Sequence, residues 1–283
     1  MSYRFRHATC NEIFEKRDFA ESCRFIKQCG YEGIEIAHFT LADDPVSITP
    51  AQRAEYRRII RDEGLKFVGL HWLMVSPAGL HVSTPDAELR ARGWQHIQNL
   101  IDLCADLGAD GTGENLVMVF GSPKQRGLTG GATREQATRN YIDGLRSVAA
   151  HAEQRQVQIL VEALPSTQTE VILSLDEAAA IVDEIGSPAI QTMFDTHNAV
   201  EETEPHEVLV ERHFPVIKHV HVNEMDGGHC GTGDYDFKPV LRKLRELNYS
   251  GWVSLEAFDF RPGAERIAKE SIDYLNQQIE LLG

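Results

Sequence analysis

The sequence predicts an α/β protein in which a single domain, residues 1–283, forms a closed (β/α)8 TIM barrel. Short apolar, β-branched runs alternate with longer amphipathic runs to the end of the chain, which is typical of βα units around a parallel sheet. Eight such pairs favour a closed barrel, because an open doubly wound sheet usually has fewer strands. No linker interrupts the pattern, so we expect one domain.

The apolar runs are the expected strands and the amphipathic runs the expected helices. Strands are predicted at residues 4–10, 33–37, 67–73, 116–120, 158–163, 191–195, 217–222 and 252–257. Helices are predicted at residues 18–29, 49–63, 85–107, 133–155, 174–185, 205–212, 237–247 and 264–281. Ser174 and Glu177 match a capping box. Left-handed helix ends are expected at Gly30, Gly64, Gly108 and Gly186.

Composition excludes several classes of protein. The formal net charge of −15, without a basic cluster, argues against a nucleic-acid partner. Five scattered cysteines without a C-x-x-C pair argue against a disulfide framework and a thiolate zinc site, and favour a cytoplasmic location. We find neither a signal peptide nor a run of ~20 apolar residues, so no membrane partner is expected. Thr9-Cys-Asn-Glu-Ile-Phe14 lacks the glycine pattern of dinucleotide binding.

Four consecutive expected strands end in a residue that can bind a metal: Glu162, Asp195, His221 and Glu256. Catalytic groups of such barrels lie at the C-terminal ends of the strands, so these four side chains should form an arc around one mouth. Three carboxylates placed together repel one another unless a cation compensates them. One imidazole with three carboxylates favours one divalent ion, Mn²⁺, Mg²⁺ or Co²⁺, with Zn²⁺ also possible.

The chain also resembles a known family, the xylose isomerase-like TIM barrels, which include sugar epimerases, hydroxypyruvate isomerases, inositol-pathway enzymes and AP endonucleases. The matching segments are Gly30-Tyr-Glu-Gly-Ile-Glu35, Val161-Glu-Ala-Leu-Pro165, Phe194-Asp-Thr-His197, His219-Val-His-Val-Asn-Glu224 with Gly231-Thr-Gly233, and Leu255-Glu256. The resemblance implies that the same four residues bind one metal. It also implies that Glu162 and Glu256 lie on opposite sides of the substrate, where one removes a proton beside a carbonyl and the other returns it.

Two positions depart from the related ketose epimerases. Those enzymes usually carry an arginine that grips the substrate six residues after the metal histidine, and this chain has Gly227 there. They often carry a histidine three residues after the metal aspartate, where this chain has Asn198, with His197 one residue earlier. The substrate contacts are therefore expected to differ.

Further candidate substrate residues are His71, Glu35, His197, Lys124 and Arg126. His71 ends the third strand, and it is either a substrate contact or an ordinary core or rim residue. Glu35 is expected to orient a metal ligand or a substrate hydroxyl, the alternative being a helix-facing salt bridge. Lys124 and Arg126 lie in a glycine-rich segment, residues 121–131, that is either a lid which binds substrate or an ordinary exposed loop.

Five other aromatic or histidine side chains carry weaker predictions. His219 should be a hydrogen-bonded core histidine below His221, and His229 should lie on the surface. Trp72, Phe120 and Phe258 are expected either to form an apolar wall for a sugar or simply to pack.

The predicted function is that of a metal-dependent isomerase or epimerase that moves a proton through an enediolate on a small polyhydroxylated carbonyl compound. A dehydratase or lyase acting on a keto-sugar or inosose would use the same machinery. Hydrolysis of the AP endonuclease type is less expected, because it requires a histidine after the fourth strand, and Val119-Phe-Gly-Ser-Pro123 has none. A non-catalytic binding or structural barrel is a third alternative. Such a protein would be expected to lack one of the four metal ligands, and this chain has all four. The sequence is compatible with a homo-oligomer.

Overall fold

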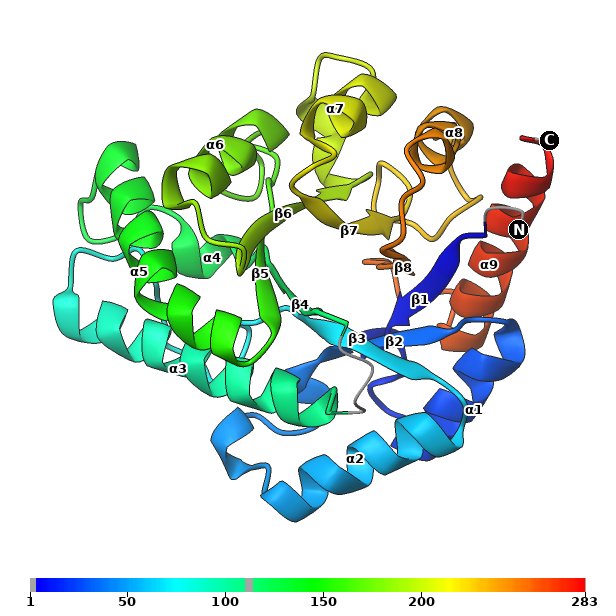
Figure 1. The fold of residues 1–283 in the computed structure, drawn as a ribbon, viewed down its shortest axis with the longest axis horizontal. Helices are drawn as coiled ribbons and strands as arrows, with labels where there is room; N and C mark the ends of the chain where they lie inside the picture. The colour runs from blue at the N-terminus through cyan, green and yellow to red at the C-terminus, as the bar shows by residue number, and fades with distance from the viewer. Residues whose placement is uncertain (1–3, 110–113, 283) are drawn as a thin grey trace.

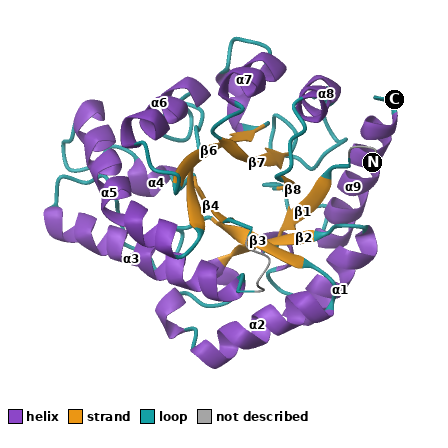
Figure 2. Ribbon diagram, viewed as in Figure 1, coloured by secondary structure: helices purple, strands orange, loops and turns teal. Residues whose placement is uncertain are grey.

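The structure is a computed structural model that describes residues 4–109 and 114–282. Eight parallel strands pair in sequence order and close into a barrel, and the helices form a ring around them (Figures 1 and 2). The last helix, α9 (Ala264–Glu280), lies beside the first strand, β1 (Arg6–Cys10), which completes the ring (Figure 1). The predicted fold is confirmed.

Every predicted strand is present, and its bounds agree with the prediction to within two residues. The strands are β1 (Arg6–Cys10), β2 (Gly33–Ala37), β3 (Lys66–His71), β4 (Leu116–Phe120), β5 (Val157–Val161), β6 (Ile190–Asp195), β7 (Ile217–Val222) and β8 (Trp252–Leu255). Strands β5 and β8 end one residue before Glu162 and Glu256, so each glutamate is the first residue beyond its strand. Asp195 pairs in register with His221.

The predicted helices are also present, each with slightly different ends. They are α1 (Phe19–Cys29), α2 (Pro50–Asp62), α3 (Ala87–Leu107), α5 (Arg134–Gln154), α6 (Leu175–Ile185), α7 (His206–His213), α8 (Lys238–Glu246) and α9. The structure adds a short helix, α4 (Pro123–Arg126), and four 3₁₀ turns: η1 (Glu12–Phe14), η2 (His38–Thr40), η3 (Pro45–Ser47) and η4 (Asn198–Glu201). Helix α4 lies inside the segment expected to be a loop.

Two predictions about helix ends need correction. The Ser174 side chain accepts from the Glu177 amide, but the Glu177 carboxylate accepts from Leu173 instead of the cap residue, so the box is shifted by one residue. Gly30, Gly64 and Gly186 have positive φ as expected, whereas Gly108 has a φ of −94°. Glycine is required there for space, since a Cβ would lie 2.3 Å from the Leu116 side chain.

The barrel interior changes from apolar to polar along the strands. Ala8 and Trp252, near the starts of β1 and β8, belong to a small apolar cluster. Two residues beyond Ala8, Cys10 is also buried and lies 4.0 Å from His221 Nε2. A second, larger apolar core lies between strands and helices. The polar layer therefore sits at the C-terminal ends of the strands, where the candidate site lies.

Two further observations concern the whole chain. All five cysteines are free thiols, so the prediction of no disulfide framework is confirmed. Among the residues that the structure describes, no helix is both long and apolar enough to cross a membrane.

Candidate metal centre and active site

The four strand-end residues come together in one buried cluster. Each of Glu162, Asp195, His221 and Glu256 offers one ligand atom, and these four atoms all lie within 4.8 Å of one another. None of the four side chains belongs to an exposed residue. Their convergence follows from the parallel barrel, which brings the ends of β5, β6, β7 and β8 to the same mouth.

His221 presents its two ring nitrogens to different partners. Nδ1 lies 2.9 Å from Glu256 Oε2 and 3.6 Å from Asp195 Oδ2, within the cluster. Nε2 lies 3.1 Å from both oxygens of Glu35, which also lies 2.8 Å from His219 Nε2. A carboxylate on the far nitrogen is the usual way in which a metal-binding imidazole is oriented.

This network decides between the alternatives for two residues. Glu35 points into the barrel and contacts His221, so the alternative of a helix-facing salt bridge is wrong. His219 is fully buried and hydrogen-bonded to Glu35, as expected of a core histidine.

The electrostatics of the cluster suit a cation. Burial, together with the charges of Glu256 and Asp195, raises the pKa of Glu162 to about 8. Burial acts in the same direction on Glu256, but the charge and hydrogen bond of His221 outweigh it and lower the pKa of that carboxyl. Asp195 Oδ2 is buried and accepts no hydrogen bond from the described residues. A divalent ion would satisfy this oxygen and the repelling carboxylates together, so the residues present fit one.

Asn198 positions the Glu162 carboxylate by a hydrogen bond, and Gly121 leaves space for it. The Asn198 side-chain amide donates to Glu162 Oε1 at 2.9 Å, and its main-chain N–H donates to Asp195 Oδ1 at 2.8 Å. At Gly121 a Cβ would lie 2.2 Å from Glu162 Oε2, so glycine leaves room for the carboxylate. Asn198, which the sequence marked only as a departure from a histidine, thus links two of the four cluster residues.

Arg126 lies neither in a substrate-binding lid nor in an exposed loop, the two alternatives predicted for residues 121–131. It is fully buried, because residues 123–126 fold into α4, and its Nη1 donates to the carbonyl oxygens of Glu162 at 2.7 Å and Phe120 at 3.1 Å. The guanidinium therefore joins the ends of β4 and β5 instead of lying on an exposed loop or reaching into the mouth. Lys124, on the same helix, is exposed.

His71 belongs to a second buried group that the sequence did not indicate in full. Its Nε2 lies 2.7 Å from Glu12 Oε2, and its Nδ1 lies 3.8 Å from Glu35 Oε1. Burial acts to lower the pKa of His71, but Cys10 and Glu12 outweigh burial and raise it well above the usual value. The sequence analysis did not identify Glu12 as a candidate, although it lies just after β1 as Glu162 and Glu256 lie just after β5 and β8.

Trp72 contacts the cluster from the rim. Its indole N–H donates to Glu256 Oε1 at 2.7 Å, and its backbone has a positive φ of 52°, which is rare for a bulky residue and often marks a functional site. The Trp72 ring stacks on Phe258, with centroids 6.2 Å apart. Trp72 and Phe258 therefore lie against each other near the mouth, whereas Phe120 packs in the core against Trp94.

Phe258 also explains the glycine at position 227. Gly227 has a φ of +82°, and a Cβ there would lie 3.2 Å from the Phe258 ring. His197 lies beside the same ring, with centroids 5.1 Å apart, and its Nδ1 lies 2.7 Å from the Met225 carbonyl oxygen. An aromatic face therefore lies beside Gly227. The expectation that His229 lies on the surface is wrong, since it is buried and lies 3.1 Å from Glu270 Oε2.

The chain matches a known family of proteins over most of its length. Residues 23–278 match the family described as "Xylose isomerase-like TIM barrel". The chain belongs to this family.

Relatives of this xylose isomerase-like barrel include several sugar epimerases. It is 23% identical to L-ribulose 3-epimerase of Methylomonas sp. over 231 residues, which cover 82% of this chain and 75% of the relative. It is 23% identical to 3-dehydro-D-guloside 4-epimerase of Escherichia coli over 251 residues, covering 88% and 90% of the two chains. A structure of D-psicose 3-epimerase with D-tagatose from Clostridium cellulolyticum superposes with a TM-score of 0.83 at 18% identity, covering 98% and 99%.

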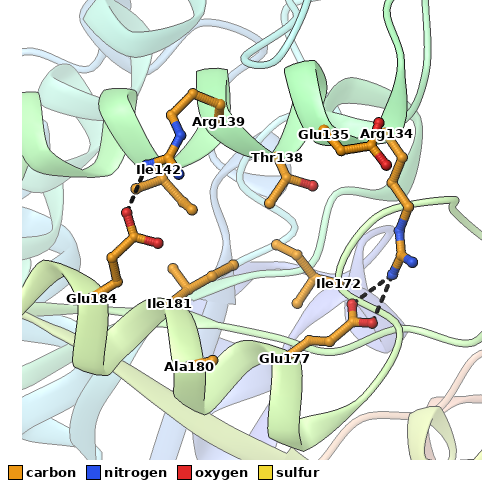
Figure 3. Close-up of a pocket in the computed structure, with 10 residues that line it drawn as sticks. All are labelled: Arg134, Glu135, Thr138, Arg139, Ile142, Ile172, Glu177, Ala180, Ile181 and Glu184. Carbon is orange, nitrogen blue, oxygen red and sulfur yellow. Dashed lines mark hydrogen bonds and ion pairs between the residues drawn. The ribbon is translucent and has the colours of Figure 1, made fainter.

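A separate hollow lies on the outer wall of the barrel, between α5 and α6 (Figure 3). Arg134 pairs with Glu177 at 2.7 Å across it, and Arg139 pairs with Glu184 at 2.6 Å. Both arginines of this hollow are already paired with glutamates, and no strand-end residue lines it. The candidate active site is therefore the buried cluster at the mouth.

Proposed function

We propose that this chain is a metal-dependent epimerase that acts on a small, sugar-like carbonyl compound. The observation that carries the proposal is the convergence of Glu162, Asp195, His221 and Glu256 from the ends of four consecutive strands. The sugar epimerases among its relatives support the class of reaction. Within this class, the aromatic surface at Phe258 favours a substrate that presents an apolar C–H face there instead of an anionic group.

The four cluster residues would hold the ion, with Mn²⁺, Mg²⁺ or Co²⁺ expected from the oxygen-rich ligand set. When bound, such an ion polarises a carbonyl oxygen and thereby acidifies the neighbouring C–H bond. Glu35 orients His221 from behind, so the protein fixes the direction of this ligand before the ion arrives.

Glu162 and Glu256 would exchange protons with the substrate carbon. One carboxylate removes a proton beside the carbonyl, and the other carboxyl group donates a proton to the opposite face, which inverts the configuration. Trp72 and His221 hold Glu256, and Asn198 holds Glu162, so both groups have defined orientations. Glu256 is buried, and the Trp72 ring that donates to it stacks on Phe258.

The test is uptake of deuterium from D₂O into carbon, because exchange reports proton abstraction whatever the product. Metal-free protein is loaded with Mn²⁺ and supplied with ketoses, keto-glycosides, inosose and hydroxypyruvate. Glu162→Gln and Glu256→Gln should each lower exchange by roughly 10²–10⁴-fold, the scale of general acid–base catalysis. Glu55→Gln, at an exposed position on α2, is the matched control and should exchange normally.

Product analysis separates epimerisation from elimination. A retained carbon skeleton with inverted configuration supports the epimerase, whereas loss of water from the substrate would assign the dehydratase alternative. If both glutamine variants keep their metal and exchange at the wild-type rate, neither glutamate is the base and the mechanism is wrong.

A further inference from the structure

We propose that the barrel holds a second divalent cation, of the zinc or cobalt type, on Cys10, Glu12, His71 and Glu256. This site lies beside the first and shares Glu256 with it. It goes beyond the proposed function, which requires only the ion held by Glu162, Asp195, His221 and Glu256.

The geometry of the second group matches that of the first. Cys10, Glu12, His71 and Glu256 each offer one ligand atom, and these four atoms all lie within 4.8 Å of one another. All four residues are buried. They come from the end of β1, from η1, from the end of β3 and from the first residue after β8, so three separate parts of the barrel wall converge on one point.

Two buried polar atoms in this group have no hydrogen-bond partner among the described residues. They are Glu12 Oε1 and His71 Nδ1, on residues that are 2% and 0% exposed. The other Glu12 oxygen and the other His71 nitrogen already contact each other at 2.7 Å. Leaving a buried polar atom unpaired costs about 1–3 kcal/mol, and a cation bound by Glu12 would satisfy its free oxygen.

The buried charge also favours a further cation in this layer. Five carboxylates lie in this layer: Glu12, Glu35, Glu162, Asp195 and Glu256. In the described part of the chain, the ion pairs formed by this layer involve only histidines: His71, His219 and His221. One divalent ion offsets only two of the five carboxylates when all are ionised, and an uncompensated negative charge in a region shielded from water is costly. A second ion next to Glu12 and Glu256 would reduce the uncompensated negative charge of this layer.

The ligand types predict a different metal preference for each site. Sulfur and imidazole ligands favour zinc or cobalt, whereas the first site has three carboxylates and no sulfur. The second site also differs from the zinc sites of AP endonucleases, which use a histidine after strand four. Here Phe120 and Gly121 occupy that region, and β1 contributes Cys10 instead.

Cobalt provides the test, because a thiolate bound to Co²⁺ gives a charge-transfer absorption in the near ultraviolet that oxygen ligands do not give. Metal-free protein, kept anaerobic, is titrated with Co²⁺ while bound metal and absorption are measured. Wild type should bind about two equivalents and develop the band. Cys10→Ser should lose the band and about one equivalent. Cys29→Ser, a partly buried cysteine outside the site, is the matched control and should behave as wild type.

Asp195→Asn distinguishes the second site from the first. If both sites exist, this variant should lose about one equivalent and keep the band. Glu12→Gln should lose the band without touching any cysteine, which keeps the test valid should Cys10→Ser fail to fold. The second site is refuted if wild type gives no band, or if Cys10→Ser and Glu12→Gln both bind as much cobalt as wild type. The proposed function would survive that result, since its own ion is the one lost in Asp195→Asn.

Discussion

Glu162→Gln should make the metal-free protein much less sensitive to pH. The carboxyl group of Glu162 is buried beside Glu256 and Asp195, and this environment raises its pKa from an ordinary 4.5 to about 8 in the folded state. Between these two values the folded state holds a proton that the unfolded chain has lost, so the free energy of unfolding falls as the pH rises. The stabilisation is complete below about pH 4.5 and is lost as the pH passes about 8.

The size of this loss follows from the change in pKa. A tenfold change in an equilibrium constant is worth about 1.4 kcal/mol, so a pKa raised from 4.5 to about 8 limits the loss to about 5 kcal/mol. Glutamine has nearly the same size as the protonated acid but does not titrate. The variant should therefore lack the pH-dependent change in unfolding free energy that Glu162 causes. A bound divalent ion compensates the ionised carboxylate and should remove most of the difference in wild type as well.

The measurement is chemical denaturation of EDTA-treated wild type and Glu162→Gln at about pH 5 and about pH 9. The difference in unfolding free energy between variant and wild type should grow in favour of the variant by up to about 4 kcal/mol from the lower to the higher pH. Adding Mn²⁺ to wild type should restore stability at the higher pH. If the two proteins lose stability in parallel across this range, Glu162 does not carry the raised pKa and the electrostatic account of the cluster is wrong.

Three further substitutions test individual contacts. Asp195→Ala should abolish tight binding at the first metal site, measured by elemental analysis after loading, and a metal content equal to that of wild type would contradict the ligand assignment. Trp72→Phe removes the N–H that donates to Glu256, a charge-assisted bond worth about 1.5–3 kcal/mol, so deuterium exchange should fall about tenfold or more at unchanged metal content. An undiminished exchange rate would show that the bond does not position the carboxylate. Arg126→Met leaves two buried carbonyl oxygens without their donor and should lower the thermal unfolding midpoint by several degrees, while an unchanged midpoint would contradict the supporting role of α4.

Periodicity and strand ends in the sequence were sufficient to predict the barrel and the four cluster residues as neighbours. The alternation of apolar runs with amphipathic runs determines which segments become parallel strands, and parallel strands in a closed barrel necessarily end at one mouth. Glu162, Asp195, His221 and Glu256 each follow such a run, so their proximity required no knowledge of the loops. The buried position of His219 followed from the same alternation of faces, whereas the sequence left two alternatives for Glu35 that only the structure decided.

Only the tertiary structure shows the contacts made by short segments and loops, because these have no helical or strand periodicity in the sequence. Glu12 lies in a 3₁₀ turn and Arg126 in a four-residue helix, both too short to leave a pattern in the sequence. Trp72 and Glu256 are 184 positions apart, and their hydrogen bond depends on an unusual backbone conformation at Trp72. A sequence pattern specifies which face of an element a side chain occupies, but the partner across the barrel is selected only when the loops have packed, because their backbone conformations set the final direction of each side chain.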